Sequence, residues 1–169
     1  AIIDNTINTD LAPTFGGYWR IIRGKQKIEH QCYLNILYKD KYLKEVADGV
    51  VFSHVLEHIP SHLVIYALKN LMFYLKPEGI LRISVPYLRT YNEPPIPKDQ
   101  RLAVPIIAQN SLIYGWGHRF MYDAQLLQAL LSHVGFKDVQ EVKSGKGKLG
   151  DTDVARRAAE TIYITAARS

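Results

Sequence analysis

The residues best suited to chemistry stand in one short run, His54-Val55-Leu56-Glu57-His58. On a helix, the H-x-x-E-H spacing presents two imidazoles to a zinc ion and a carboxylate as general base, as in some zinc hydrolases. Pro60 follows at once and interrupts any helix at this point. A zinc hydrolase is therefore the least favoured of three hypotheses, and we expect no metal ligand set.

Two strands and a helix must position this run. Residues 49–53 form an apolar stretch too short for a helix, which is typical of a strand buried in a parallel sheet. After a predicted N-cap at Ser61, apolar residues recur with helical spacing as far as residue 75, and a second buried-type strand spans 80–85. A strand–helix–strand unit of these lengths predicts the α/β class, with the histidines at the carboxyl end of a strand, where such sheets bind ligands.

Other elements follow from shorter patterns. Asp123 is predicted to cap a second amphipathic helix that Gly135 ends. Four prolines between 87 and 121 disfavour long regular elements, so this segment is expected to be a lid over the site. Further strands are expected at 7–11, 30–36, 136–142 and 161–166, with a short helix at 39–46.

Composition excludes several classes of protein. The chain has 169 residues, 47% of them hydrophobic and 22% charged, which indicates one globular domain over 1–169. Cys32 is the single cysteine, so no internal disulfide forms and a reducing, cytoplasmic location is expected. We expect no membrane span. Basic residues gather between 18 and 44, yet no nucleic-acid motif accompanies them, so a solvated surface is the favoured interpretation and a nucleic-acid partner is not expected.

Several segments in order resemble one known family. They are Asp48-Gly49-Val50-Val51-Phe52-Ser53-His54-Val55-Leu56-Glu57-His58-Ile59, Leu75-Lys76-Pro77-Glu78-Gly79, Ile83-Ser84-Val85-Pro86, Gly117-His118-Arg119-Phe120-Met121-Tyr122-Asp123 and Gly135-Phe136-Lys137-Asp138-Val139. Together they are similar to the core of class I S-adenosylmethionine-dependent methyltransferases of the small single-domain type. The likeness covers most of residues 5–167.

The resemblance implies a Rossmann-like, doubly wound α/β fold, with a mostly parallel sheet and an antiparallel C-terminal strand. It implies S-adenosyl-L-methionine as cofactor and methyl transfer to a small-molecule or glycan acceptor, whose identity the sequence leaves open. The cofactor-binding residues that it implies are Asp10 for the ribose, Leu34, Asn35 and Ile36 for the adenine, and Ser53, His54 and Val55 for the methionine part. Candidate catalytic residues are His54, His58, His118 and Tyr122, and candidate substrate contacts are Tyr87 and Arg119.

Bland alternatives stand beside these assignments. Glu57 and His58 could form a buried structural pair, and Tyr122 could be a core residue. His118 and Arg119 could be a loop cluster without a chemical role.

The chain departs from the family at one important place. The glycine-rich motif that holds the methionine part of the cofactor is missing, and Gly16-Gly17 follows the wrong strand to replace it. Because the chain opens at Ala1 without Met, we expect the domain to be N-terminally incomplete. The alternative is a non-catalytic, methyltransferase-like domain that binds a partner. A sheet with an exposed gap would also favour pairing between chains as a homodimer.

Overall fold

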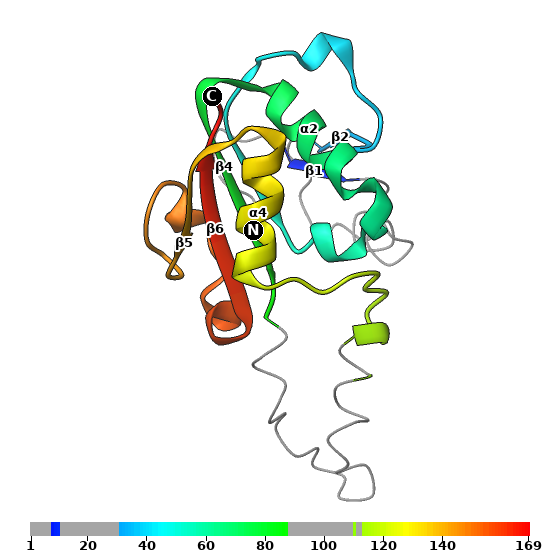
Figure 1. Ribbon diagram of the computed structural model, residues 1–169, viewed down its shortest axis with the longest axis vertical. Coiled ribbons are helices and arrows are strands. Elements are labelled where there is room, and N and C mark those ends of the chain that lie inside the picture. The colour runs from blue at the N-terminus through cyan, green and yellow to red at the C-terminus, as the bar shows by residue number, and fades with distance from the viewer. Residues whose placement is uncertain (1–7, 11–30, 88–109, 111–112) are drawn as a thin grey trace, which may run out of the picture.

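The computed structural model describes residues 8–10, 31–87, 110 and 113–169 (Figure 1). Its strands are β1 (Asn8–Asp10), β2 (Gln31–Tyr33), β3 (Ala47–Ser53), β4 (Leu75–Pro86), β5 (Lys137–Val142) and β6 (Thr161–Ala167), and its longer helices are α2 (Val64–Tyr74) and α4 (Ala124–Val134). Short 3-10 turns lie at Lys41–Leu43, Leu56–His58, Ser61–Leu63, Gly150–Thr152 and Ala155–Glu160. No helix in this part of the chain has the length and apolar character that a membrane crossing requires.

A mixed sheet of four strands forms the centre of the molecule. Its strand order is β3-β4-β6-β5, with β3 parallel to β4 and with β6 antiparallel to both of its neighbours. The predicted Rossmann-like α/β arrangement, with one antiparallel strand at the C-terminus, is therefore confirmed. β4 is the longest strand and pairs along both edges, so it carries the segment that ends at Tyr87 toward the carboxyl end of β3.

The two remaining strands form a second sheet. β1 and β2 run parallel, with Asp10 opposite Tyr33 at their carboxyl ends. Among the described residues no ladder joins β1 or β2 to β3. The resemblance implies that the strand which carries the missing glycine-rich motif would be central in the sheet, between these two groups of strands.

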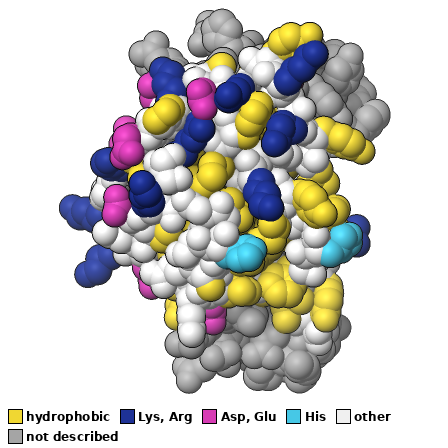
Figure 2. Space-filling model, turned by 45° about the horizontal axis from the view of Figure 1, so that its top comes forward, with side chains coloured by type: hydrophobic (Ala, Val, Ile, Leu, Met, Phe, Trp, Pro, Cys, Tyr) yellow, Lys and Arg dark blue, Asp and Glu magenta, His cyan; other side chains and the backbone are white. Residues whose placement is uncertain are grey.

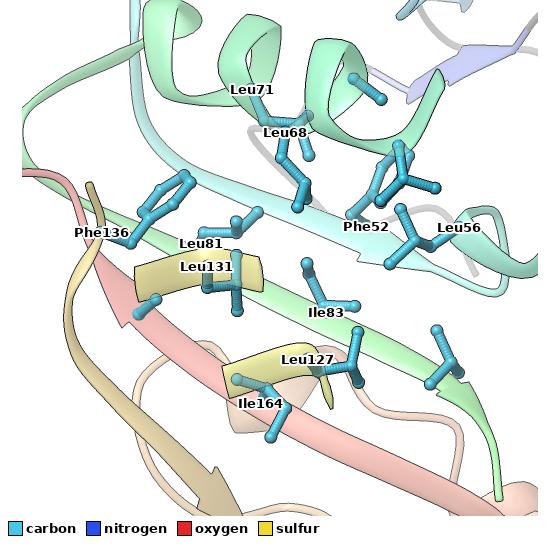
Figure 3. Close-up of a cluster of buried hydrophobic side chains, with 14 of the residues drawn as sticks. Phe52, Leu56, Leu68, Leu71, Leu81, Ile83, Leu127, Leu131, Phe136 and Ile164 are labelled. Carbon is cyan, nitrogen blue, oxygen red and sulfur yellow. The ribbon is translucent and has the colours of Figure 1, made fainter. Parts of the chain in front are cut away.

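One face of the four-stranded sheet carries the hydrophobic core. Figure 3 shows Leu68 and Leu71 of α2 and Leu127 and Leu131 of α4 above the strands. Beneath them lie the inward-facing strand residues Leu81, Ile83 and Ile164. The helices cover this face because their leucines recur at helical spacing, while alternate strand residues point toward them.

The opposite face is held by a buried ion pair. Arg82 alternates with Leu81 and Ile83 along β4, so its side chain points away from the helices. Its guanidinium donates through Nε and Nη2 to the two carboxylate oxygens of Asp153, and through Nη1 to the carbonyls of Lys146 and Lys148. The loop between β5 and β6 is thereby fixed against the sheet.

The sequence predicts the ends of α4 correctly but not the start of α2. Asp123 caps α4, with Oδ1 accepting from Leu126 N at 2.8 Å, and Gly135 ends it at φ 111°, both as predicted. The predicted N-cap at Ser61 is wrong, because a 3-10 turn begins there and α2 starts at Val64 without a side-chain cap.

The short helix expected at 39–46 is also wrong. Only Lys41–Leu43 forms a 3-10 turn, and the chain then turns at Glu45 with φ 54°, so that the amides of Glu45 and Val46 bond the carbonyls of Phe73 and Tyr74. These carbonyls belong to the last turn of α2, which has no helical partners for them. A long-range pairing thus replaces the local helix.

Candidate functional site

The carboxyl end of β3 turns sharply at His54. This residue adopts φ 53°, a left-handed conformation that a non-glycine residue enters only where its surroundings hold it. Its amide donates to Ser84 O at 2.8 Å. The turn sends the imidazole toward two groups, with Nδ1 3.3 Å from Glu57 Oε1 and Nε2 3.4 Å from Thr161 Oγ1.

Glu57 lies at the centre of the site and is 1% exposed. Neither carboxylate oxygen makes a hydrogen bond within the described residues, although His54 approaches within ion-pair range. Burying a carboxylate without hydrogen-bond donors costs free energy, and a ligand or a positive charge beside the carboxylate would lower that cost.

The main chain of Glu57 binds the segment that carries His118. Its carbonyl oxygen accepts from Arg119 N at 2.7 Å and from Phe120 N at 3.2 Å. This pairing brings together two parts of the chain that are about sixty residues apart in sequence.

Two histidines stand against each other at the outer side of Glu57. The rings of His58 and His118 meet edge to face, with centroids 4.9 Å apart. His58 Nε2 is 3.9 Å from Glu57 Oε1, and its Nδ1 is 3.3 Å from the carbonyl oxygen of Gly117. One ligand atom from each of Glu57, His58 and His118 lies within 4.8 Å of the others.

Tyr122 is the most deeply buried of the candidate catalytic residues. The side chain is 2% exposed and its hydroxyl donates to Leu56 O at 3.5 Å. Burial, and then the charge of Glu57, raises the pKa of Tyr122.

The remaining candidates on this side lie at strand ends. Ser53 is exposed and its hydroxyl accepts from Ser84 Oγ at 2.8 Å, while Val55 packs partly into the core. Tyr87 forms an isolated bridge with Tyr122, and Arg119 is exposed. The structure thus brings the predicted residues of 53–58, 87 and 118–122 into one neighbourhood.

The residues expected near the adenine, 34–36, follow β2 and lie beside the second half of α2. Ile36 is buried, and its carbonyl accepts from Asn70 Nδ2 at 2.7 Å in the second half of the helix. The Oδ1 of Asn35 is occupied by Leu37 N at 3.0 Å, and Leu34 packs partly against the core. His54 and Glu57, by contrast, lie in the segment that leads into the helix.

Asp10 is the last residue of β1, where it pairs in register with Tyr33 of β2.

The predicted lid and the predicted basic stretch lie only partly in the described residues. Residues 88–109 and 111–112 of the lid, and 18–30 of the basic stretch, fall outside them. Tyr114 and Trp116 of the lid are exposed. On the face in Figure 2, basic side chains are interspersed with acidic and hydrophobic ones.

Sequence reasoning left Glu57 out of the catalytic and binding set, and gave it a role only as the general base of the least favoured hypothesis or as part of a structural pair. Its position between two histidines was the available signal. The main-chain contacts with Arg119 and Phe120 had no sequence signal, because any residue but proline can supply an amide donor.

Comparisons with known proteins agree with this geometry. The sequence profile of the family described as "Methyltransferase domain" matches residues 7–141. No protein with a curated function matches the chain significantly.

Three solved structures illustrate the likeness of fold. The carbon-methyltransferase domain of the citrinin polyketide synthase superposes with TM-score 0.60 at 16% identity, over 95% of this chain and 38% of that one. A SAM-dependent methyltransferase from Archaeoglobus fulgidus gives 0.58 at 15%, over 95% and 75%. The methyltransferase CalH, in complex with SAH, gives 0.56 at 17%, over 95% and 42%. The chain thus spans about two fifths of the first of these relatives.

Proposed function

Since the chain belongs to the family of methyltransferase domains, we propose that it binds S-adenosylmethionine and transfers its methyl group to a small-molecule or glycan acceptor. The observation that carries the proposal is the profile match over residues 7–141, which spans both β1 and the histidine-bearing end of β3. The match therefore includes the strand ends at which an open α/β sheet holds its ligands.

The residues at these strand ends fit the cofactor in their chemistry. Asp10 would accept hydrogen bonds from the ribose hydroxyls, and a carboxylate makes such bonds stronger than a neutral acceptor does. Ser53 offers an exposed hydroxyl and His54 a polar ring for the methionine part. Leu34 and Asn35 are half-buried and can line the adenine, whereas the buried side chain of Ile36 supports them from below.

When bound, the sulfonium supplies an activated methyl group and leaves with the bonding electron pair as S-adenosylhomocysteine. The protein's part is then to hold the acceptor atom in line with the methyl–sulfur bond, which is where most of the rate gain of such a displacement arises. His54, His58 and His118 line the acceptor side, and Tyr87 and Arg119 lie at its rim. Tyr122 closes the wall as a neutral phenol.

The proposed class of acceptor is argued from the aromatic residues in and beside the segment 87–121. Tyr87, Tyr114 and Trp116 give this part of the chain an aromatic character, which suits a flat or sugar-like molecule. No nucleic-acid motif accompanies the basic residues of the sequence, so a nucleic-acid acceptor is not proposed. With Cys32 as the single cysteine, we propose that the enzyme works in the cytoplasm.

A second candidate is a non-catalytic domain that binds a partner. It is favoured by one observation: within the described residues no glycine-rich turn follows the parallel strands β2 and β3, and Gly145, Gly147 and Gly150 follow β5, which pairs antiparallel with β6. Cofactor binding separates the two candidates directly.

The test is calorimetric titration of S-adenosylmethionine and S-adenosylhomocysteine into the wild-type chain and into Asp10→Asn. We expect saturable binding that weakens about 10-fold or more in the variant, because a hydrogen bond to a charged group contributes about 1.5–3 kcal/mol. Asp48→Asn is the matched control, since Asp48 is an exposed strand aspartate at the opposite end of β3. A wild-type chain that binds neither compound would contradict the proposal and favour the partner-binding domain.

A further inference from the structure

We propose that Glu57, His58 and His118 form a binding site for one divalent transition-metal ion such as Zn²⁺. Nitrogen ligands from two histidines and an oxygen ligand from one carboxylate are a set that such ions accept, with positions left open for water or a ligand. The sequence alone led us to expect no metal ligands, and the basis for revising this is the arrangement of these three side chains.

The first support is their mutual spacing. One ligand atom from each residue lies within 4.8 Å of the other two. Around a tetrahedral zinc ion, with bonds of about 2.1 Å, ligand atoms stand roughly 3.4 Å apart. The cluster therefore needs to close by little more than 1 Å, and the partly exposed ring of His58 has the freedom to do so.

The second support is the state of Glu57. Its side chain is 1% exposed, and its two oxygens accept no hydrogen bond from any described residue. A metal ion would provide the positive charge and the bonds that this buried carboxylate lacks. The feature is independent of the spacing and points to the same occupant.

The third support is the orientation of His58. Its Nδ1 lies 3.3 Å from the carbonyl oxygen of Gly117, and a carbonyl can only accept, so Nδ1 carries the hydrogen. In the neutral ring Nε2 then holds the lone pair, and Nε2 is the atom that faces Glu57 Oε1. Metal-binding histidines are commonly oriented in this way, with the second ring nitrogen bonded to a carbonyl.

His54 stays outside the set. Its Nε2 is near Thr161, and it sits on the left-handed turn before the helix entry. The site consequently differs from the H-x-x-E-H arrangement of zinc hydrolases, in which both histidines of the motif would lie on one helix and bind the ion. Residues 54–58 form a turn and a 3-10 segment instead.

The proposal stands apart from the proposed methyl transfer. Metal binding requires neither the cofactor nor the acceptor, so it is measured on the chain alone. The ion would lie on the acceptor side of the site, where its open positions could take an oxygen atom of the acceptor.

The experiment is titration of Co²⁺ and, separately, Zn²⁺ into chelator-treated chain that carries no histidine tag. We expect one equivalent of Co²⁺ to bind with visible d–d absorption bands, and Zn²⁺ to displace it. His58→Ala and Glu57→Gln should each weaken binding by at least the roughly 10–100-fold that loss of an outer-shell partner costs. Circular dichroism checks that both variants are folded, and His58 is exposed enough to be replaced without damage to the core.

His62→Ala and His133→Ala are the matched controls, because both histidines are exposed and lie outside the cluster. They should leave binding unchanged. Absence of stoichiometric binding would overturn the proposal. Binding that falls in the control variants but persists in His58→Ala would overturn it too, as adventitious surface binding.

A separate outcome pattern identifies failure of the proposed function. If Co²⁺ binds at the cluster while neither S-adenosylmethionine nor S-adenosylhomocysteine binds, the metal site holds and the methyltransferase activity does not. The reverse result would keep the proposed activity and remove the metal site.

Discussion

Two buried charges of this chain, Arg82 and Glu57, are partnered in opposite ways. Each is 1% exposed. Arg82 donates from all three of its nitrogens to Asp153 and to two carbonyls of the loop between β5 and β6. Glu57 accepts no hydrogen bond through its carboxylate from the part of the chain that the structure describes.

This difference indicates that Arg82 has a structural role, whereas Glu57 is available to bind a ligand. Arg82 is fully used by the protein, so it ties a loop to the sheet and offers nothing to another molecule. Glu57 retains its bonding capacity at the carboxyl end of β3, beside three histidines. A buried polar group without hydrogen-bond partners indicates a functional site, whereas a buried polar group with all its partners indicates a structural role.

The largest effect that this contrast predicts is on stability. Arg82→Met should lower the free energy of unfolding by about 3–5 kcal/mol, because it leaves Asp153 buried without its counter-charge. Urea denaturation followed by circular dichroism measures the change. A loss of less than about 1 kcal/mol would mean that the pair has no structural role.

The double variant Arg82→Met/Asp153→Leu is its control. Replacing both charges with apolar side chains should recover most of the lost stability, since no uncompensated charge remains buried. A double variant as unstable as the single one would assign the loss to packing instead.

The second prediction concerns Glu57 in the metal-free protein. Glu57→Gln should change the free energy of unfolding by less than about 1 kcal/mol at pH 8, because the carboxylate has no hydrogen bonds to lose and an amide costs less to bury than a charge. The same urea experiment in the presence of chelator measures it. A loss as large as that of Arg82→Met would break the comparison, since Glu57 would then be an equally structural charge.

The smallest effect belongs to a partly exposed pair, Glu45 and Arg168. The hydrogen bond from Arg168 Nη2 at 2.7 Å lowers the pKa of Glu45 below its ordinary value of 4.5, and desolvation opposes it. Because the folded-state pKa is the lower one, the contribution is fully present above the ordinary value and is lost as pH falls through the folded-state pKa.

Denaturation of wild type and Glu45→Gln between pH 7 and pH 3 measures this contribution. The stability difference between the two proteins should shrink as the carboxylate is protonated. A difference that stays constant with pH would show that the hydrogen bond does not depend on the charge of Glu45.

The sequence predicts the elements whose signals are local. Both ends of α4 follow from Asp123 and Gly135, because a cap acts on amides and carbonyls within one turn of itself. The helix expected at 39–46 fails for the opposite reason. Its amides bond the last carbonyls of α2, some thirty residues further along the chain, and no local pattern reports that contact.

The site divides along the same line. The closeness of His54, Glu57 and His58 follows from their spacing, whereas the arrival of His118 depends on main-chain bonds that carry no side-chain signal. For Arg82, the apolar pattern of β4 predicted a buried strand but no partner, and Asp153 lies far along the chain. The residue types therefore indicated which groups could react, whereas contacts between distant parts of the chain determine which of these groups lie close together.

The carbonyl oxygen of Glu57, with its two amide donors from Arg119 and Phe120, has a consequence for redesign. Amide donors are common to every residue except proline, so both bonds persist when the side chains change. The exposed side chain of Arg119 is free to vary, whereas the Phe120 ring meets Tyr122 edge to face with centroids 5.1 Å apart. A library randomised at position 119 would therefore vary the entrance of the site without disturbing the spacing of the histidines. New acceptors could be screened on an unaltered reactive centre.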